Sequence, residues 1–114
     1  MIRAFALAAA AVLCLSGAAL AADGIVGNWT TDSGETAAIT GGGPFRITIK
    51  TGKHAGKRIG SMSAAGDNKY EGEITDPAND KTYSGKATLS GNALKMSGCV
   101  LGGLICRSQN WKRQ

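Results

Sequence analysis

The sequence has very few of the residues from which catalytic and metal sites are built. Among its 114 residues there is one histidine, His54, with no cysteine or carboxylate close to it in sequence. Metal sites need several convergent ligands, and nucleophilic catalysis needs a nucleophile held against a base. We therefore expect no catalytic residue, no metal ligand and no cofactor, and we predict that the protein is not an enzyme.

Long apolar runs are absent outside the first 22 residues. There, Arg3 precedes an apolar run over residues 5–15, and small residues follow as far as Ala21. This order is typical of a secretory signal peptide, and the run is shorter than the about 20 residues of a membrane span. We expect a signal peptide over residues 1–22, cleavage after Ala21 or Ala22, and no transmembrane segment. The protein is then periplasmic or secreted, with one domain over residues 23–114.

Cysteine is also scarce, and only Cys99 and Cys106 follow the expected signal peptide. Their spacing is not Cys-x-x-Cys, which disfavours a redox role. Two cysteines in a small exported domain are expected to form a structural disulfide.

No helix-length pattern is present after the signal peptide. Glycine is abundant, and short alternating segments lie between turn signals such as Gly91-Asn92 and Gly102-Gly103. This arrangement predicts an all-β fold, a small antiparallel up-and-down β-barrel of about eight strands. The strands are expected at residues 27–31, 35–40, 45–50, 57–63, 69–75, 82–90, 93–101 and 104–112.

The last four strands can be aligned through their turns. A two-residue turn at Gly102-Gly103 places Cys99 opposite Cys106, at a Cα separation that a disulfide accepts. The same reasoning at the other turns predicts these further pairs: Val100 with Ile105, Leu89 with Leu94, Ala87 with Met96, Thr88 with Lys95, Tyr83 with Val100, Ile74 with Tyr83, and Glu71 with Lys86. Apolar residues then fall mostly on one face of the sheet, as a period of two requires.

This alignment also predicts a row of glycines on the inward face. Gly72, Gly85 and Gly98 lie at one height on three adjacent strands, with Arg107 beside them. One interpretation is curvature, because glycines let a sheet coil sharply enough to close. The other is the floor of a pocket, or a slot that receives Arg107.

The last strand places Arg107, Gln109 and Arg113 on the inward face with Trp111. Buried charge needs partners. Either these side chains lie at the barrel mouth, or a bulge reverses the register after Cys106.

The first and last strands pair in a closed meander, so Trp29 could meet Arg113 and plug one end of the barrel. The residues that we expect to face a ligand or to close the barrel are Trp29, Gly72, Tyr83, Gly85, Gly98, Arg107, Trp111 and Arg113.

Basic residues gather in the middle of the chain, at Lys50, Lys53, Lys57 and Arg58. Such a stretch either attracts an anionic component of the cell envelope or is a solvated loop. Because we expect export, we expect no nucleic-acid partner.

Motifs in the second half carry a family resemblance. They include Gly72-Glu73-Ile74-Thr75-Asp76-Pro77 and Arg107-Ser108-Gln109-Asn110-Trp111. They resemble the bacterial family catalogued as domain of unknown function 2147, over about residues 27–113, and the opening Gly27-Asn28-Trp29 with a late-strand Arg resembles the lipocalin-type barrels. The resemblance implies a lipocalin-like barrel in the cell envelope and brings no catalytic residues.

From these observations we expect a lipocalin-like binding module for a small apolar or amphipathic ligand. The alternative is a structural or protein-interaction barrel whose interior is filled by its own side chains. The sequence does not indicate an oligomeric state. An empty interior of about 300 Å³ or more would favour the ligand.

Overall fold

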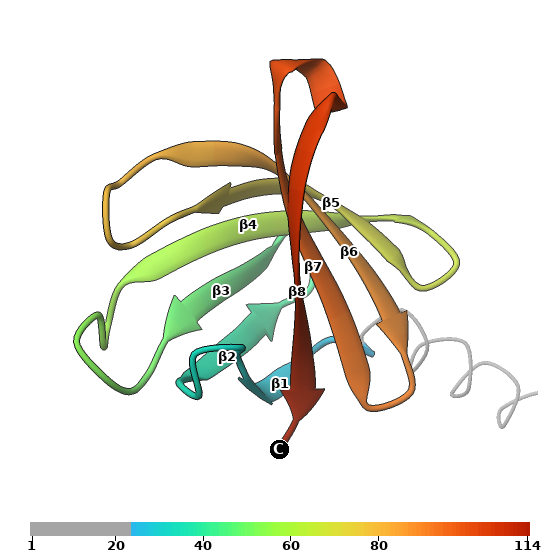
Figure 1. Ribbon diagram of the computed structural model, residues 1–114. Helices are drawn as coiled ribbons and strands as arrows, with labels where there is room; N and C mark the ends of the chain where they lie inside the picture. The colour runs from blue at the N-terminus through green and yellow to red at the C-terminus, as the bar shows by residue number, and fades with distance from the viewer. Residues whose placement is uncertain (1–23) are drawn as a thin grey trace, which may run out of the picture.

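A computed structural model describes residues 24–114 as a closed antiparallel β-barrel of eight strands in the order β1-β2-β3-β4-β5-β6-β7-β8 (Figure 1). The expected signal peptide, with Cys14, lies outside the described residues. The all-β fold and its up-and-down topology are as predicted. Closure leaves β1 as the neighbour of both β2 and β8.

The strands lie within a few residues of the expected positions. Their bounds are β1 Gly27–Thr30, β2 Thr36–Gly41, β3 Phe45–Ile49, β4 Arg58–Gly66, β5 Lys69–Thr75, β6 Thr82–Ser90, β7 Ala93–Val100 and β8 Ile105–Arg113, with a short 3-10 turn η1 at Leu101–Gly103. The largest difference is in β4, which runs three residues past the expected end. It pairs there with the start of β5 through a register shift between Ala64 and Gly66.

The predicted alignment of the last four strands is confirmed at nearly every pair. Leu89 lies opposite Leu94, Glu71 opposite Lys86, and Cys99 opposite Cys106. The disulfide is present, with a Cα separation of 4.1 Å.

One predicted pair is wrong. The β6–β7 ladder ends at Ser84 opposite Cys99, so Tyr83 does not reach Val100. Beyond that point β7 pairs with β8 alone, and the β7–β8 hairpin rises away from the barrel (Figure 1). The reason is that β6 turns into its own loop at Thr82 while β7 continues outward.

The glycine row lies in the predicted register, but its members have different surroundings. A Cβ at Gly72 would lie 2.0 Å from the Ser61 carbonyl oxygen, so β4 and β5 approach too closely for any side chain. A Cβ at Gly85 would lie 2.7 Å from the Met62 methyl carbon, the end of a flexible side chain. Gly98 has only ordinary contacts at 3.4 Å. The curvature interpretation therefore applies to Gly72 and Gly85.

The apolar core fills the end of the barrel where the β2–β3, β4–β5 and β6–β7 turns lie. Trp29 is completely buried, and its indole Nε1 donates a hydrogen bond to the Ile25 carbonyl oxygen at 2.9 Å. Phe45 and Tyr70 pack edge to face with ring centroids 5.6 Å apart. The other large members of this cluster are Ile25, Ile39 and Leu94. We call this end the packed end.

None of the helical turns within residues 24–114 has the length and hydropathy that a membrane-spanning helix requires.

Candidate functional site

A cavity of about 590 Å³ occupies the opposite end of the barrel, which we call the open end. The β1–β2, β3–β4, β5–β6 and β7–β8 connections all lie at this end, because antiparallel strands place alternate connections together. The barrel is thus packed at one end and hollow at the other. This cavity volume is larger than the interior volume of about 300 Å³ above which we expect a ligand site.

The inner wall of the cavity is apolar. Ile49, Ile59, Met96 and Trp111 line it and are each at most 5% exposed, so each presents only a small part of its surface to the cavity. Ile74 and Tyr83, both half-buried, complete this wall at the adjoining ends of β5 and β6. Such a wall suits an acyl chain or an aromatic ring.

The β7–β8 hairpin forms a second, outer wall. Its inward residues Gly98, Val100 and Ile105 line the cavity, and Gly98 leaves room there because it has no side chain. Since the hairpin rises off the barrel, this wall extends the cavity beyond Thr82, where β6 begins.

Arg107 and Gln109 are the polar groups that β8 adds to the cavity. The Gln109 side-chain oxygen accepts a hydrogen bond from Trp111 Nε1 at 2.9 Å, which fixes the indole ring in the wall. Arg107 is exposed, and the ion pair found within residues 24–114 joins other residues, Lys57 and Asp80. The guanidinium is therefore free to meet an anionic group at the mouth.

The β8 register decides between the two interpretations of these polar residues. The β7–β8 ladder has no register shift along its length, so no bulge turns Arg107 and Gln109 outward. They lie at the barrel mouth, which is the first alternative. Arg113 lies at the other end of β8 and does not line the cavity.

Arg113 closes the packed end. Its guanidinium lies 4.4 Å from the centre of the Trp29 ring and donates to the Gly24 carbonyl oxygen at 2.7 Å. The cation is thus stacked and hydrogen-bonded where it is half-buried.

The loop between β5 and β6 forms one lip of the mouth. Asp76 Oδ1 accepts a hydrogen bond from the Ala78 amide at 2.9 Å, and the Asp76 amide donates to the Lys81 carbonyl oxygen at 2.8 Å. Lys57, from the β3–β4 loop, pairs with Asp80 and reaches the Pro77 carbonyl oxygen at 3.4 Å. These contacts tie the two loops together, so this lip has a defined shape.

The basic stretch therefore divides. Lys57 is engaged by Asp80, whereas Lys50, Lys53 and Arg58 are exposed on and beside the β3–β4 loop at the open end. His54 lies on the same loop. Within residues 24–114, no three His, Cys, Asp or Glu side chains gather as a metal site.

The eight residues predicted to face a ligand or to close the barrel thus separate into three groups. Tyr83, Gly98, Arg107 and Trp111 line the cavity. Trp29 and Arg113 plug the packed end. Gly72 and Gly85 lie outside the cavity and serve the close approach of β4, β5 and β6.

Sequence reasoning missed the isoleucines of the inner wall and Met96. Ile49 and Ile59 flank the β3–β4 loop, whose length left the pairing of these strands open. The alternation of Ile49 and Ile59 with polar neighbours indicates that their side chains point inward, but it does not indicate that they line a cavity.

Residues 48–113 match a family described as an uncharacterized protein conserved in bacteria, domain of unknown function 2147. The chain belongs to this family. The match covers β4 to β8 and the end of β3, which supply nearly all of the cavity wall. Residues 27–47, where we noted the opening Gly27-Asn28-Trp29, lie outside the match. No curated protein and no solved structure matches this chain.

Proposed function

We propose that this member of the family is an exported, non-catalytic binding protein that holds a small amphipathic molecule in the open end of its barrel. The observation that carries the proposal is the 590 Å³ cavity, within the range of small-molecule sites. A barrel filled by its own side chains, the alternative from the sequence, fits only the packed end.

The lining supports one orientation of the ligand. The apolar part lies against Ile59, Met96 and Trp111 at the bottom of the cavity. A polar or anionic head lies at the mouth beside Arg107, which forms no ion pair within residues 24–114. Glu35 and Asp76 also line the mouth, so a head bearing one negative charge fits better than a strongly anionic one.

Binding of 1-anilinonaphthalene-8-sulfonate, an anionic aromatic probe, tests the proposal. We expect fluorescence enhancement that saturates, and competition by dodecanoate, a single-chain carboxylate. Gly98→Leu adds four carbons to the cavity wall at a position where a Cβ makes only ordinary contacts, so probe affinity should fall about tenfold or more.

Ala93→Leu is the matched control, because it adds leucine atoms to an exposed position of the same strand at the packed end. Its probe affinity should stay near that of the unchanged protein. Equal losses in the two variants, or no saturable binding by the unchanged protein, would refute the proposal. Release of the protein into the periplasm, with loss of residues 1–21 or 1–22 by intact mass, tests export separately.

A further inference from the structure

The tip of the β7–β8 hairpin is apolar and bare. In residues 24–114, five large apolar side chains are exposed, and four of them lie at this tip: Val100, Leu101, Leu104 and Ile105, between 37% and 85% exposed. Single exposed apolar residues are ordinary, but a cluster marks a surface that another apolar phase covers. Between Cys99 and Arg107 the chain carries no charged side chain.

This tip stands clear of the rest of the molecule. β6 leaves β7 at Cys99, and β1 pairs with β8 only at Lys112 and Arg113. Figure 1 shows the hairpin projecting beyond every other strand, with η1 at its end. A flat or curved surface approaching from that side would therefore meet the tip first.

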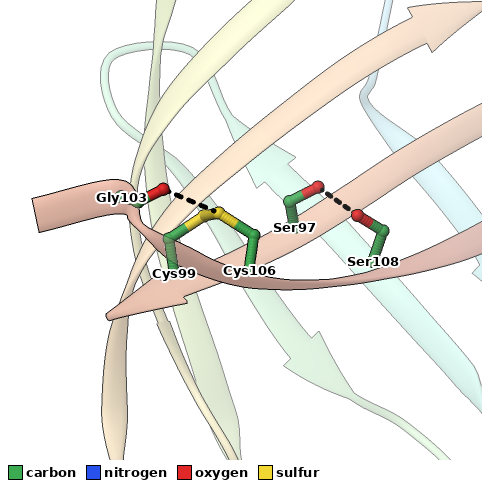
Figure 2. Close-up of a disulfide and its surroundings, with 5 residues drawn as sticks. All are labelled: Ser97, Cys99, Gly103, Cys106 and Ser108. Carbon is green, nitrogen blue, oxygen red and sulfur yellow. Dashed lines mark hydrogen bonds between the residues drawn. A yellow bond between two sulfur atoms is a disulfide. The ribbon is translucent and has the colours of Figure 1, made fainter. Parts of the chain in front are cut away.

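The hairpin is stiff before it meets anything. The Cys99–Cys106 disulfide joins its strands directly below the tip, and the Ser97 and Ser108 hydroxyls form a hydrogen bond at 2.8 Å on the same face (Figure 2). At the tip, the Leu104 amide donates to the Leu101 carbonyl oxygen at 3.3 Å. Such a preformed tip loses little conformational freedom on docking.

Charge indicates what the tip meets. Residues 82–114, which form β6 to β8, contain no Asp or Glu and five basic residues, Lys86, Lys95, Arg107, Lys112 and Arg113. The described chain has twelve basic and seven acidic residues, since Arg3 and Asp23 lie outside it, and so a net charge of +5. Arg107 is the basic residue next to the tip, and the exposed Lys50, Lys53 and Arg58 lie at the same open end, whereas Arg113 is stacked on Trp29 at the packed end.

We propose that the β7–β8 tip docks on the surface of an anionic lipid bilayer, with Leu101 and Leu104 inserted among the acyl chains. An apolar tip at an open end that carries exposed basic side chains fits such a surface, where apolar burial and attraction to anionic headgroups add together. A second copy of the chain is a poorer partner, because each copy brings the same positive charge.

Docking in this way places the cavity against the lipid. Val100 and Ile105 belong both to the tip and to the cavity wall, so the apolar surface is continuous from one to the other. This extends the proposed function, since an amphipathic ligand could pass along the hairpin from the bilayer. The docking itself does not depend on whether the cavity holds a ligand.

Flotation with vesicles of phosphatidylcholine, with and without phosphatidylglycerol, tests the proposal at low and high salt. All proteins carry the same N-terminus, checked by intact mass, so residues 1–23 contribute equally. We expect binding to the anionic vesicles that weakens with salt. The double variant Leu101→Ser, Leu104→Ser should bind about tenfold or more weakly, and the control Val26→Ser, an exposed apolar position at the packed end, should bind unchanged.

A second measurement reports insertion directly. Leu104→Trp should show a blue-shifted emission and quenching by brominated lipid acyl chains, whereas Val26→Trp should show neither. Gly98→Leu should dock as the unchanged protein does, even if it no longer binds the anionic probe. This arm separates failure of the docking from failure of the proposed function.

Three outcomes would overturn the docking proposal. The first is equal binding of the tip variant and the unchanged protein. The second is the absence of vesicle binding. The third is concentration-dependent self-association that the tip variant abolishes while vesicles have no effect, which would assign the tip to a second copy.

Discussion

The two ends of the barrel are built from the same eight strands but are packed in different ways. At the packed end, Trp29, Phe45 and Leu94 fill the interior and are almost fully buried. At the open end, the inward positions of β7 and β8 are held by Gly98, Arg107 and Gln109, and the interior is hollow. Stability and binding are therefore expected to reside in different residues, and substitutions at the two ends should separate them.

Trp29→Ala should have the largest effect on stability. The ring is 0% exposed, hydrogen-bonded to Ile25 and stacked under Arg113, so its removal leaves a cavity and loses both of these contacts. We expect a loss of about 3–5 kcal/mol in the free energy of unfolding, measured by urea denaturation. A loss below about 1 kcal/mol would show that the packed end does not hold the barrel together.

The glycine row provides the next test, because its three members differ only in their surroundings. Gly72→Ala drives a methyl group into the Ser61 carbonyl and should cost about 3 kcal/mol or more. Gly85→Ala displaces the flexible Met62 methyl and crowds the backbone of Glu73 and Ile74 at 3.2 and 3.3 Å, and should cost about 1–2 kcal/mol. Gly98→Ala should stay within about 0.5 kcal/mol of the unchanged protein. Thermal melts compare the three, and an equal cost at all three positions would contradict this explanation of the row.

Removing the disulfide should have an intermediate effect that is confined to the hairpin. The bridge closes a loop with a sequence separation of 7, and such a loop predicts a loss of about 2–3 kcal/mol in Cys99→Ser, Cys106→Ser. Ser97→Ala, Ser108→Ala, which removes the neighbouring hydroxyl pair on the same face, should cost about 1 kcal/mol or less. Urea denaturation of both double variants checks the order, and hydrogen exchange should show faster opening at residues 99–106 only in the first.

The C-terminal half of the fold followed from the sequence because its turns fix the register. Gly91-Asn92 and Gly102-Gly103 each mark one short turn. Counting residues outward from these turns gives the strand register, including the row from Gly72 to Arg107. The half with long connections could not be aligned in this way. There the β3–β4 register shifts between Ile47 and Thr48, and nothing in the local pattern indicated that irregularity.

The cavity could not be predicted, because it depends on where the ladders stop. β8 pairs with β7 at eight positions but with β1 at only two, which lets the hairpin tilt away and opens the interior beside Trp111. The alternation that identifies Ile59 and Met96 as inward is the same for a filled and a hollow barrel. Only the three-dimensional arrangement of their neighbours distinguishes the two.

Arg107→Gln should have the smallest effect on stability and a clear effect on binding. The side chain is exposed, and the ion pair in residues 24–114 does not involve it, so unfolding should change by less than about 0.5 kcal/mol. The affinity for the anionic probe should fall several-fold, because the amide cannot offer a charge to the sulfonate. Lys95→Gln, on the outer face of β7, removes the same charge without touching the cavity and is the matched control. Equal losses of probe affinity in the two variants would assign the effect to overall charge, whereas a loss confined to Arg107→Gln places the anionic head at the mouth of the open end.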